Sequence, residues 1–204
     1  MRAEGTLLWI GVALAVAALL LPGCPRGGTT TSGSGSPCAR SIDGDLATAR
    51  SRLDKGRVDE AVLYVDALVG CPGVLESPRF LQVALDVYEE VGRLNEAWSV
   101  GSVALEEIPD GEPARDRIIE RLAAFESRYA LLVSPRDGRG GLTIDHTGPV
   151  TDAATEHQLK AVRMGRGVLL DAGQRGFWLF PGGYRIEGEE MTLKAGERTM
   201  DPRP

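Results

Sequence analysis

The chain contains no block of basic residues. Its 204 residues include 23 Lys and Arg against 29 Asp and Glu, which gives a formal net charge of −6 at pH 7. Nucleic-acid-binding proteins take most of their affinity from a clustered positive face. Polybasic segments recruit proteins to anionic membranes in a similar way. The composition therefore argues against both kinds of electrostatic partner, and we expect no nucleic-acid binding.

Histidine is scarce, which limits the possible chemistry. The two histidines stand beside acids, as Asp145-His146 and Glu156-His157. Such pairs can ligate a metal or transfer protons. However, the His-Glu-x-x-His spacing is absent, and adjacent residues of a strand point to opposite faces. Ser134 could complete a triad with Asp145 and His146, but no Gly-x-Ser-x-Gly motif supports it. We therefore predict no enzyme activity, no metal site and no cofactor.

The N-terminus carries an uncharged run that is short for a membrane span. Residues 7–21 form an apolar stretch of about 15 residues, whereas a spanning helix needs about 20. This length is typical of the apolar core of a signal peptide. The run closes on Leu21-Pro22-Gly23-Cys24.

This ending resembles the lipobox of bacterial lipoprotein signals. The resemblance implies a signal peptide over residues 1–23, cleavage before Cys24 and a lipid such as palmitate on its thiol. The mature chain would be anchored in the bacterial cell envelope. Pro25, where an Asp would retain the protein, favours the outer membrane facing the periplasm. The alternative is an uncleaved N-terminal anchor, which also leaves the chain exported and attached. Residues 24–40 are rich in Gly, Ser and Thr and predict a flexible tether.

Residues 41–128 have the periodicity of helices. Apolar residues recur at intervals of three and four, the spacing of one helix face. Motifs rich in Gly and Pro separate the segments, and Ser77-Pro78 is a typical helix start. We expect five helices, over about residues 42–53, 58–69, 78–91, 94–108 and 113–125.

Two of the turns repeat. Gly56-Arg57-Val58-Asp59-Glu60-Ala61 returns 36 residues later as Gly92-Arg93-Leu94-Asn95-Glu96-Ala97. A helix-pair unit with a period in the thirties is typical of an α-solenoid. The motif resembles the tetratricopeptide repeat, which implies stacked antiparallel helix pairs. The alternative is an ordinary helical bundle with a repeated turn.

That resemblance also implies a concave, peptide-binding face on the first helix of each pair. By register, the face carries a polar stripe of Arg79, Gln82, Asp86 and Glu89. We predict partner binding there, and the alternative is a solvated helix face.

The cysteines sort into one lipidated residue and one pair. If Cys24 carries lipid, Cys38 and Cys71 remain in an exported protein, where disulfides persist. In an antiparallel helix pair these two positions lie at the same end. We predict a bridge, which would stabilise the fold by about 3–4 kcal/mol for the loop it closes. The alternative is two buried free thiols.

Residues 129–204 change to Gly-rich segments with short β runs, which predicts a small antiparallel β-sandwich. Phe180-Pro181-Gly182-Gly183-Tyr184 is similar to the hairpin of PEGA and carboxypeptidase-regulatory-like modules. Residues 151–159 predict a long loop or a short helix. The expected strands are residues 130–133, 142–145, 167–170, 177–180, 184–187 and 190–193.

We therefore expect an α-then-β protein that acts as a non-enzymatic scaffold or assembly adaptor for another envelope protein. The alternative is a lipoprotein that binds cell wall or carbohydrate through the β module. Phe177 and Trp178 would supply the stacking platform in that case, although such a pair in a strand more often lies in the core.

Overall fold

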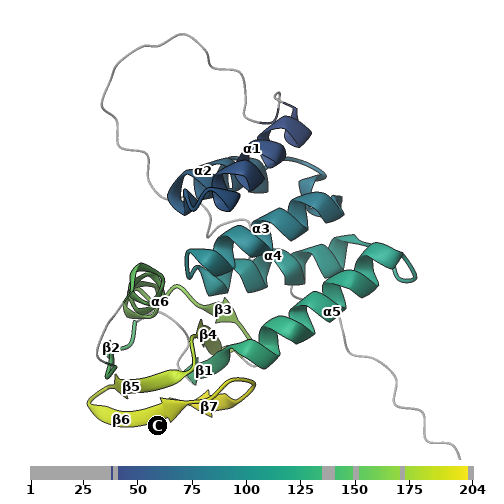
Figure 1. Cartoon of the computed structure of the whole chain (residues 1–204). Coiled ribbons are helices and arrows are strands. Elements are labelled where there is room, and N and C mark those ends of the chain that lie inside the picture. The colour runs from purple at the N-terminus through teal and green to yellow at the C-terminus, as the bar shows by residue number, and fades with distance from the viewer. Residues whose placement is uncertain (1–37, 39–40, 135–140, 149–151, 171–172, 202–204) are drawn as a thin grey trace, which may run out of the picture. The chain divides into compact units, whose positions relative to one another are not determined.

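A computed structural model describes residues 38, 41–134, 141–148, 152–170 and 173–201. The predicted signal peptide, Cys24 and all of the tether except Cys38 lie outside these residues. The chain divides into Met1–Ser34 and Gly35–Pro204, and the second unit contains every described residue. Within it, a helical segment is followed by a mixed sheet region (Figure 1).

The helices begin and end close to the predicted positions. Ser41 and Ser77 accept hydrogen bonds from the amides of Gly44 and Phe80, so each caps a helix through its side chain. Pro78 follows as the first helical residue. The helical elements are α1 (Ile42–Asp54), α2 (Val58–Val69), η3 (Val74–Glu76), α3 (Pro78–Glu90), α4 (Leu94–Glu107) and α5 (Pro113–Arg128).

The repeated motif forms the same turn twice. Gly56 and Gly92 have φ angles of 69° and 76°, in the left-handed region that glycine adopts at low cost. After each glycine, an arginine amide donates to a carbonyl five residues earlier, from Arg57 to Arg52 and from Arg93 to Tyr88. This hydrogen bond closes the C-terminus of α1 and of α3 in the same manner. The sequence repeat is therefore also a repeat of backbone geometry.

A disulfide joins Cys38 to Cys71 across a Cα–Cα distance of 5.4 Å, as the cysteine pattern predicts. Cys38 precedes α1 and is exposed, whereas Cys71 follows α2 and is buried. The bond therefore ties the start of the first helix to the end of the second.

The C-terminal region forms two sheets. The first has the strand order β3-β4-β1-β7, and the second has the order β2-β5-β6. β1 pairs with β4 in antiparallel fashion but with β7 in parallel, so the expectation of a purely antiparallel arrangement is wrong. The elements are β1 (Ala130–Ser134), β2 (Ile144–His146), α6 (Ala153–Arg163), β3 (Val168–Leu169), β4 (Arg175–Leu179), β5 (Gly182–Ile186), β6 (Glu189–Leu193) and β7 (Arg198–Met200).

The segment predicted as a loop or a short helix, residues 151–159, contains the first part of α6, which continues to Arg163. Asp152 caps it by accepting from the Thr155 amide, and this hydrogen bond lowers the pKa of the Asp152 carboxyl. Leu159 and Val162 of α6 pack into one core with residues from both sheets, including Phe177 and Tyr184. The helix therefore covers the sheet region on the side of β2 and β5 (Figure 1).

Strand β4 contributes to two cores. Phe177 is 1% exposed and lies in the sheet core, whereas Trp178 is 5% exposed and lies in the helical core. The Trp178 ring packs 5.0 Å from the ring of Trp98 and 5.3 Å from that of Phe125, measured between centroids. Because both β4 aromatics are buried, they form no exposed platform on which a sugar could stack.

The two turn glycines provide a matched test of the packing. Both have positive φ angles, so alanine at either position costs about 1 kcal/mol of backbone strain. A Cβ at Gly56 meets nothing within 4 Å, whereas one at Gly92 would overlap the backbone of Ala154 in α6. We expect Gly92→Ala to lower the free energy of unfolding by at least about 1 kcal/mol more than Gly56→Ala, because it adds overpacking to the strain. Urea denaturation of both variants measures the difference, and equal losses would contradict the packing of α6 on this turn.

Candidate interaction face on α1, α3 and α5

The predicted stripe lies on α3 and runs from solvent into the protein. Its side chains become progressively less exposed, from 68% for Arg79 to 27% for Asp86 and 7% for Glu89. Gln82 is exposed. The four residues therefore share a helix face, but only its N-terminal half is open to solvent.

The charged residues of the stripe are paired with the neighbouring first helices. Arg79 contacts Asp43 of α1 at 3.3 Å. Asp86 accepts from Arg50 of α1 at 2.7 Å and from Arg121 of α5 at 2.8 Å. The pairs Asp43–Arg79 and Arg50–Asp86 are each 36 residues apart, the offset of the turn repeat. Equivalent positions of the two helix pairs thus carry opposite charges.

Glu89 is the most enclosed charge of the face. Its carboxylate lies 2.7 Å from a guanidinium nitrogen of Arg121 and 2.6 Å from one of Arg128. The Tyr129 hydroxyl donates a hydrogen bond to it at 3.0 Å. Burial, together with the charge of Glu89, raises the pKa of Tyr129 to about 12. This hydroxyl therefore stays protonated, and remains a donor, across the physiological range.

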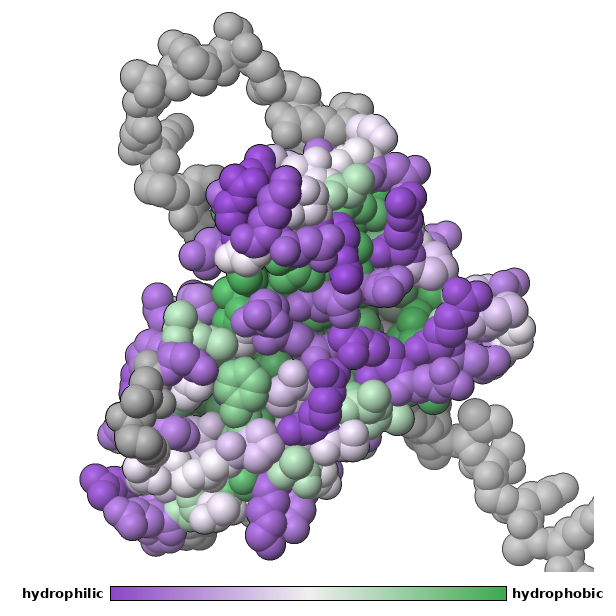
Figure 2. All heavy atoms as spheres, in the orientation of Figure 1, coloured by the Kyte–Doolittle hydropathy of each residue, from purple (hydrophilic) through white to green (hydrophobic). Residues whose placement is uncertain are grey.

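These contacts form what we call the charge ladder, a set of ion pairs that links α1, α3 and α5. It consists of a connected series from Arg50 through Glu89 to Arg128 and of the separate exposed pair Asp43–Arg79. The sequence predicted the α3 members but not the others. Opposite charges at the repeat offset of 36 residues were an available signal for the α1 members, Asp43 and Arg50, but not for the α5 arginines. The helices on the side shown in Figure 2 carry mostly hydrophilic residues, with apolar ones in the seams between them. The members are Asp43, Arg50, Arg79, Asp86, Glu89, Arg121 and Arg128.

The ladder determines which groups a partner could use. Asp86 and Glu89 are already ion-paired with arginines, so recruiting them would leave those arginines unpaired at a cost. Arg79 and Asp43 form an exposed pair, which is weak and easily exchanged for a pair with another protein. Gln82 has polar atoms open to solvent. The usable part of the face is therefore its N-terminal half, around Arg79 and Gln82.

A second polar cluster links α2, α3 and α4. The Tyr88 hydroxyl donates to Asp66 at 2.8 Å, and Arg93 pairs with the same carboxylate at 2.7 Å. The Arg93 guanidinium also lies 4.8 Å from the centroid of the Tyr88 ring. Burial raises the pKa of Tyr88 well above its usual value. Because these groups satisfy one another, the cluster ties the helices together rather than exposing reactive groups.

The two histidines lie on different elements and are used locally. His157 of α6 lies 3.0 Å from the carbonyl of Val91, and His146 of β2 accepts from the amide of Gly148. Within the part of the chain that the structure describes, no three His, Cys, Asp or Glu side chains gather where they could hold a metal ion. None of the helices in that part combines the length and the apolar character needed to cross a membrane.

Comparison with known proteins identifies no relative: no family model matches the chain, no curated protein is significantly similar to it, and no solved structure shares its fold to a significant degree.

Because the charged side chains of the face differ in burial, removing the charge of each should lower the free energy of unfolding by a different amount. Glu89→Gln keeps the shape but removes the charge that holds Arg121, Arg128 and Tyr129, and we expect it to lower the free energy of unfolding by about 2 kcal/mol. Asp43→Asn breaks an exposed pair, so its cost should stay below about 0.5 kcal/mol. Urea denaturation at low and high salt measures both. Similar losses for the two variants would contradict the assignment of Glu89 as the enclosed end of the ladder.

Proposed function

We propose that this protein is a lipid-anchored envelope protein that holds a partner protein on the face formed by α1, α3 and α5. In this proposal the helices are a short α-solenoid of tetratricopeptide type, and the strands with α6 are a small β-sandwich. The protein acts as a scaffold or assembly adaptor and performs no chemistry of its own.

The repetition of the face is the observation that carries this proposal. Two turns with the same backbone geometry, 36 residues apart, end α1 and α3, and ion pairs join α3 to both α1 and α5. Helix-pair arrays of this kind offer an extended surface that suits a peptide segment. The exposed Arg79 and Gln82 supply polar groups for specificity at the open end.

Two features support anchoring in an envelope. The sequence ends its apolar N-terminal run on a lipobox-like motif at Cys24. The Cys38–Cys71 disulfide suits an oxidising compartment, such as the bacterial periplasm. A lipid on Cys24 would hold the helices near the membrane surface, where a partner of the same envelope is available.

Binding of cell wall or carbohydrate receives no comparable support. Its proposed platform required Phe177 and Trp178 at the surface, and both are buried. We therefore keep the scaffold as the proposed function.

Site-specific photo-crosslinking tests the docking face. p-Benzoylphenylalanine in place of Gln82 should give one discrete adduct in intact cells, because this side chain lies at the open end of the face. The same probe in place of Leu63 of α2, which is 68% exposed, is the matched control and should give none. The adduct should be reduced at least fivefold by Arg79→Glu. Adducts from Leu63 alone, or no adduct from Gln82, would refute docking on this face.

Metabolic labelling tests the anchor separately. An alkyne-bearing palmitate should label the wild-type chain, and Cys24→Ser should abolish the label while Cys38→Ser retains it. In-gel fluorescence after click coupling measures the incorporation. Labelling that persists in Cys24→Ser would contradict lipidation at this residue, without bearing on the docking face.

A further inference from the structure

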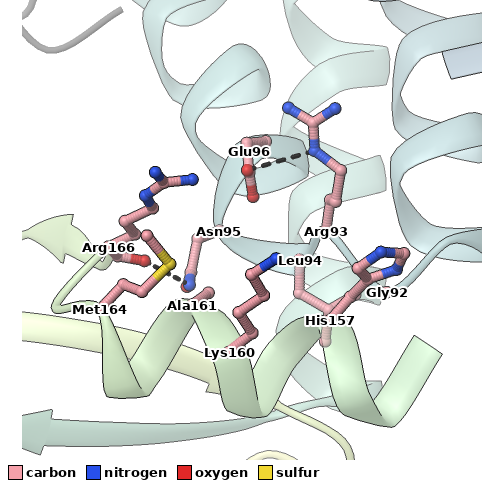
Figure 3. Close-up of a pocket in the computed structure, with 10 residues that line it drawn as sticks. All are labelled: Gly92, Arg93, Leu94, Asn95, Glu96, His157, Lys160, Ala161, Met164 and Arg166. Atoms are coloured by element: carbon pink, nitrogen blue, oxygen red, sulfur yellow. Dashed lines mark hydrogen bonds and ion pairs between the residues drawn. The ribbon is translucent and has the colours of Figure 1, made fainter. Parts of the chain in front are cut away.

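A cavity of about 290 Å³ lies between the first turn of α4 and the exposed side of α6. Figure 3 shows that the side chain of Lys160 rises from α6 toward the start of α4. No member of the charge ladder lines this cavity. It is therefore a feature separate from the proposed docking face.

Two cations of the cavity have no partner. Among the residues that the structure describes, the side chains of Lys160 and Arg166 make no hydrogen bond or ion pair. Arg93 differs, since it lies between Asp66 and Glu96 at 2.7 and 3.2 Å. His157 is held by the Val91 carbonyl. Lys160 and Arg166 are thus available to a ligand.

The N-terminus of α4 adds to the positive electrostatic potential of the cavity. Arg93 at the N-cap gives the first-turn amides no side-chain acceptor, and the side chain of Asn95 is committed to the Arg166 carbonyl and the Trp178 amide. The helix dipole is positive at this end, which disfavours a nearby ammonium group such as that of Lys160. An anion between them would relieve the repulsion and accept from the free amides.

We propose that this cavity binds a carboxylate group between the Lys160 ammonium, the Arg166 guanidinium and the first-turn amides of α4. Glu96 lines the same cavity with one oxygen paired to Arg93, so the positive charge open to a ligand is that of Lys160 and Arg166. Met164, which is 50% exposed, offers an apolar contact beside the charges. A carboxylate attached to a small apolar group fits this arrangement.

The carboxylate could be carried by a peptide or by a small organic acid. Amide chemical shifts of Leu94, Asn95 and Glu96 in the ¹⁵N-labelled full chain, held in detergent micelles, distinguish the two sources. The probes are acetate, acetyl-Ala-Ala with a free C-terminus, its C-terminal amide, and phosphate, all at equal ionic strength. We expect saturable shifts with the free acids. Tighter binding of acetyl-Ala-Ala than of acetate supports a peptide source, whereas equal or weaker binding supports a small acid.

Matched variants test which cations bind the carboxylate. Lys160→Met and Arg166→Met should each weaken the binding at least fivefold, whereas Lys55→Met should leave it unchanged, because Lys55 is an unpaired cation at the far end of α1. Shifts in the wild-type chain that rise linearly without saturation would overturn the proposal, as would equal binding of the C-terminal amide. Saturation by phosphate at a lower concentration than by acetate would overturn the choice of a carboxylate.

Discussion

The buried side chain of Asn95 fixes how the helices meet the sheet. Its amide nitrogen donates to the Arg166 carbonyl at 2.9 Å, and its oxygen accepts from the Trp178 amide at 2.9 Å. Buried backbone groups that lose such partners cost about 1–3 kcal/mol each, so one side chain sets the position of β4 against α4. Trp178 then packs against Trp98 and Phe125. Since β4 pairs with both β1 and β3, the order of the first sheet depends on this contact.

The charge ladder contributes to the packing of three helices. Each ion pair joins α3 to α1 or to α5, so the ladder holds these three helices against one another. Its exposed pair, Asp43–Arg79, contributes little to stability, and under the proposed function it is the pair that a partner would replace. Its enclosed end, at Glu89, is tied to Tyr129 just before β1 and so connects the face to the sheet region. The stabilising contacts are therefore concentrated around Glu89, away from the exposed pair.

Local patterns predicted the helices and most strands well, because caps, glycine turns and apolar spacing act within a few residues. Pairings between segments that are far apart in the sequence were harder to predict. The parallel pairing of β1 with β7 joins residues that are 67 positions apart, such as Leu131 and Arg198. Because β7 has only three residues, its sequence is too short to show a strand periodicity. For the candidate face, register alone located Arg79, Gln82, Asp86 and Glu89. The arginines that neutralise Asp86 and Glu89 depend on how α1 and α5 pack beside α3, which a single helix pattern does not encode.

The Cys38–Cys71 disulfide also has a mechanical consequence. Consider a force that is applied to the chain before Cys38 and resisted by residues after η3. This force passes through the sulfur–sulfur bond directly to Cys71. The first helix pair then sits on a side loop outside the line of tension, so such a pull cannot unravel it. Without the bond, the 33 residue steps between the two cysteines would join that line and could lengthen it by roughly 110 Å when fully extended. The bridge therefore sets the maximum reach of the chain as well as its stability.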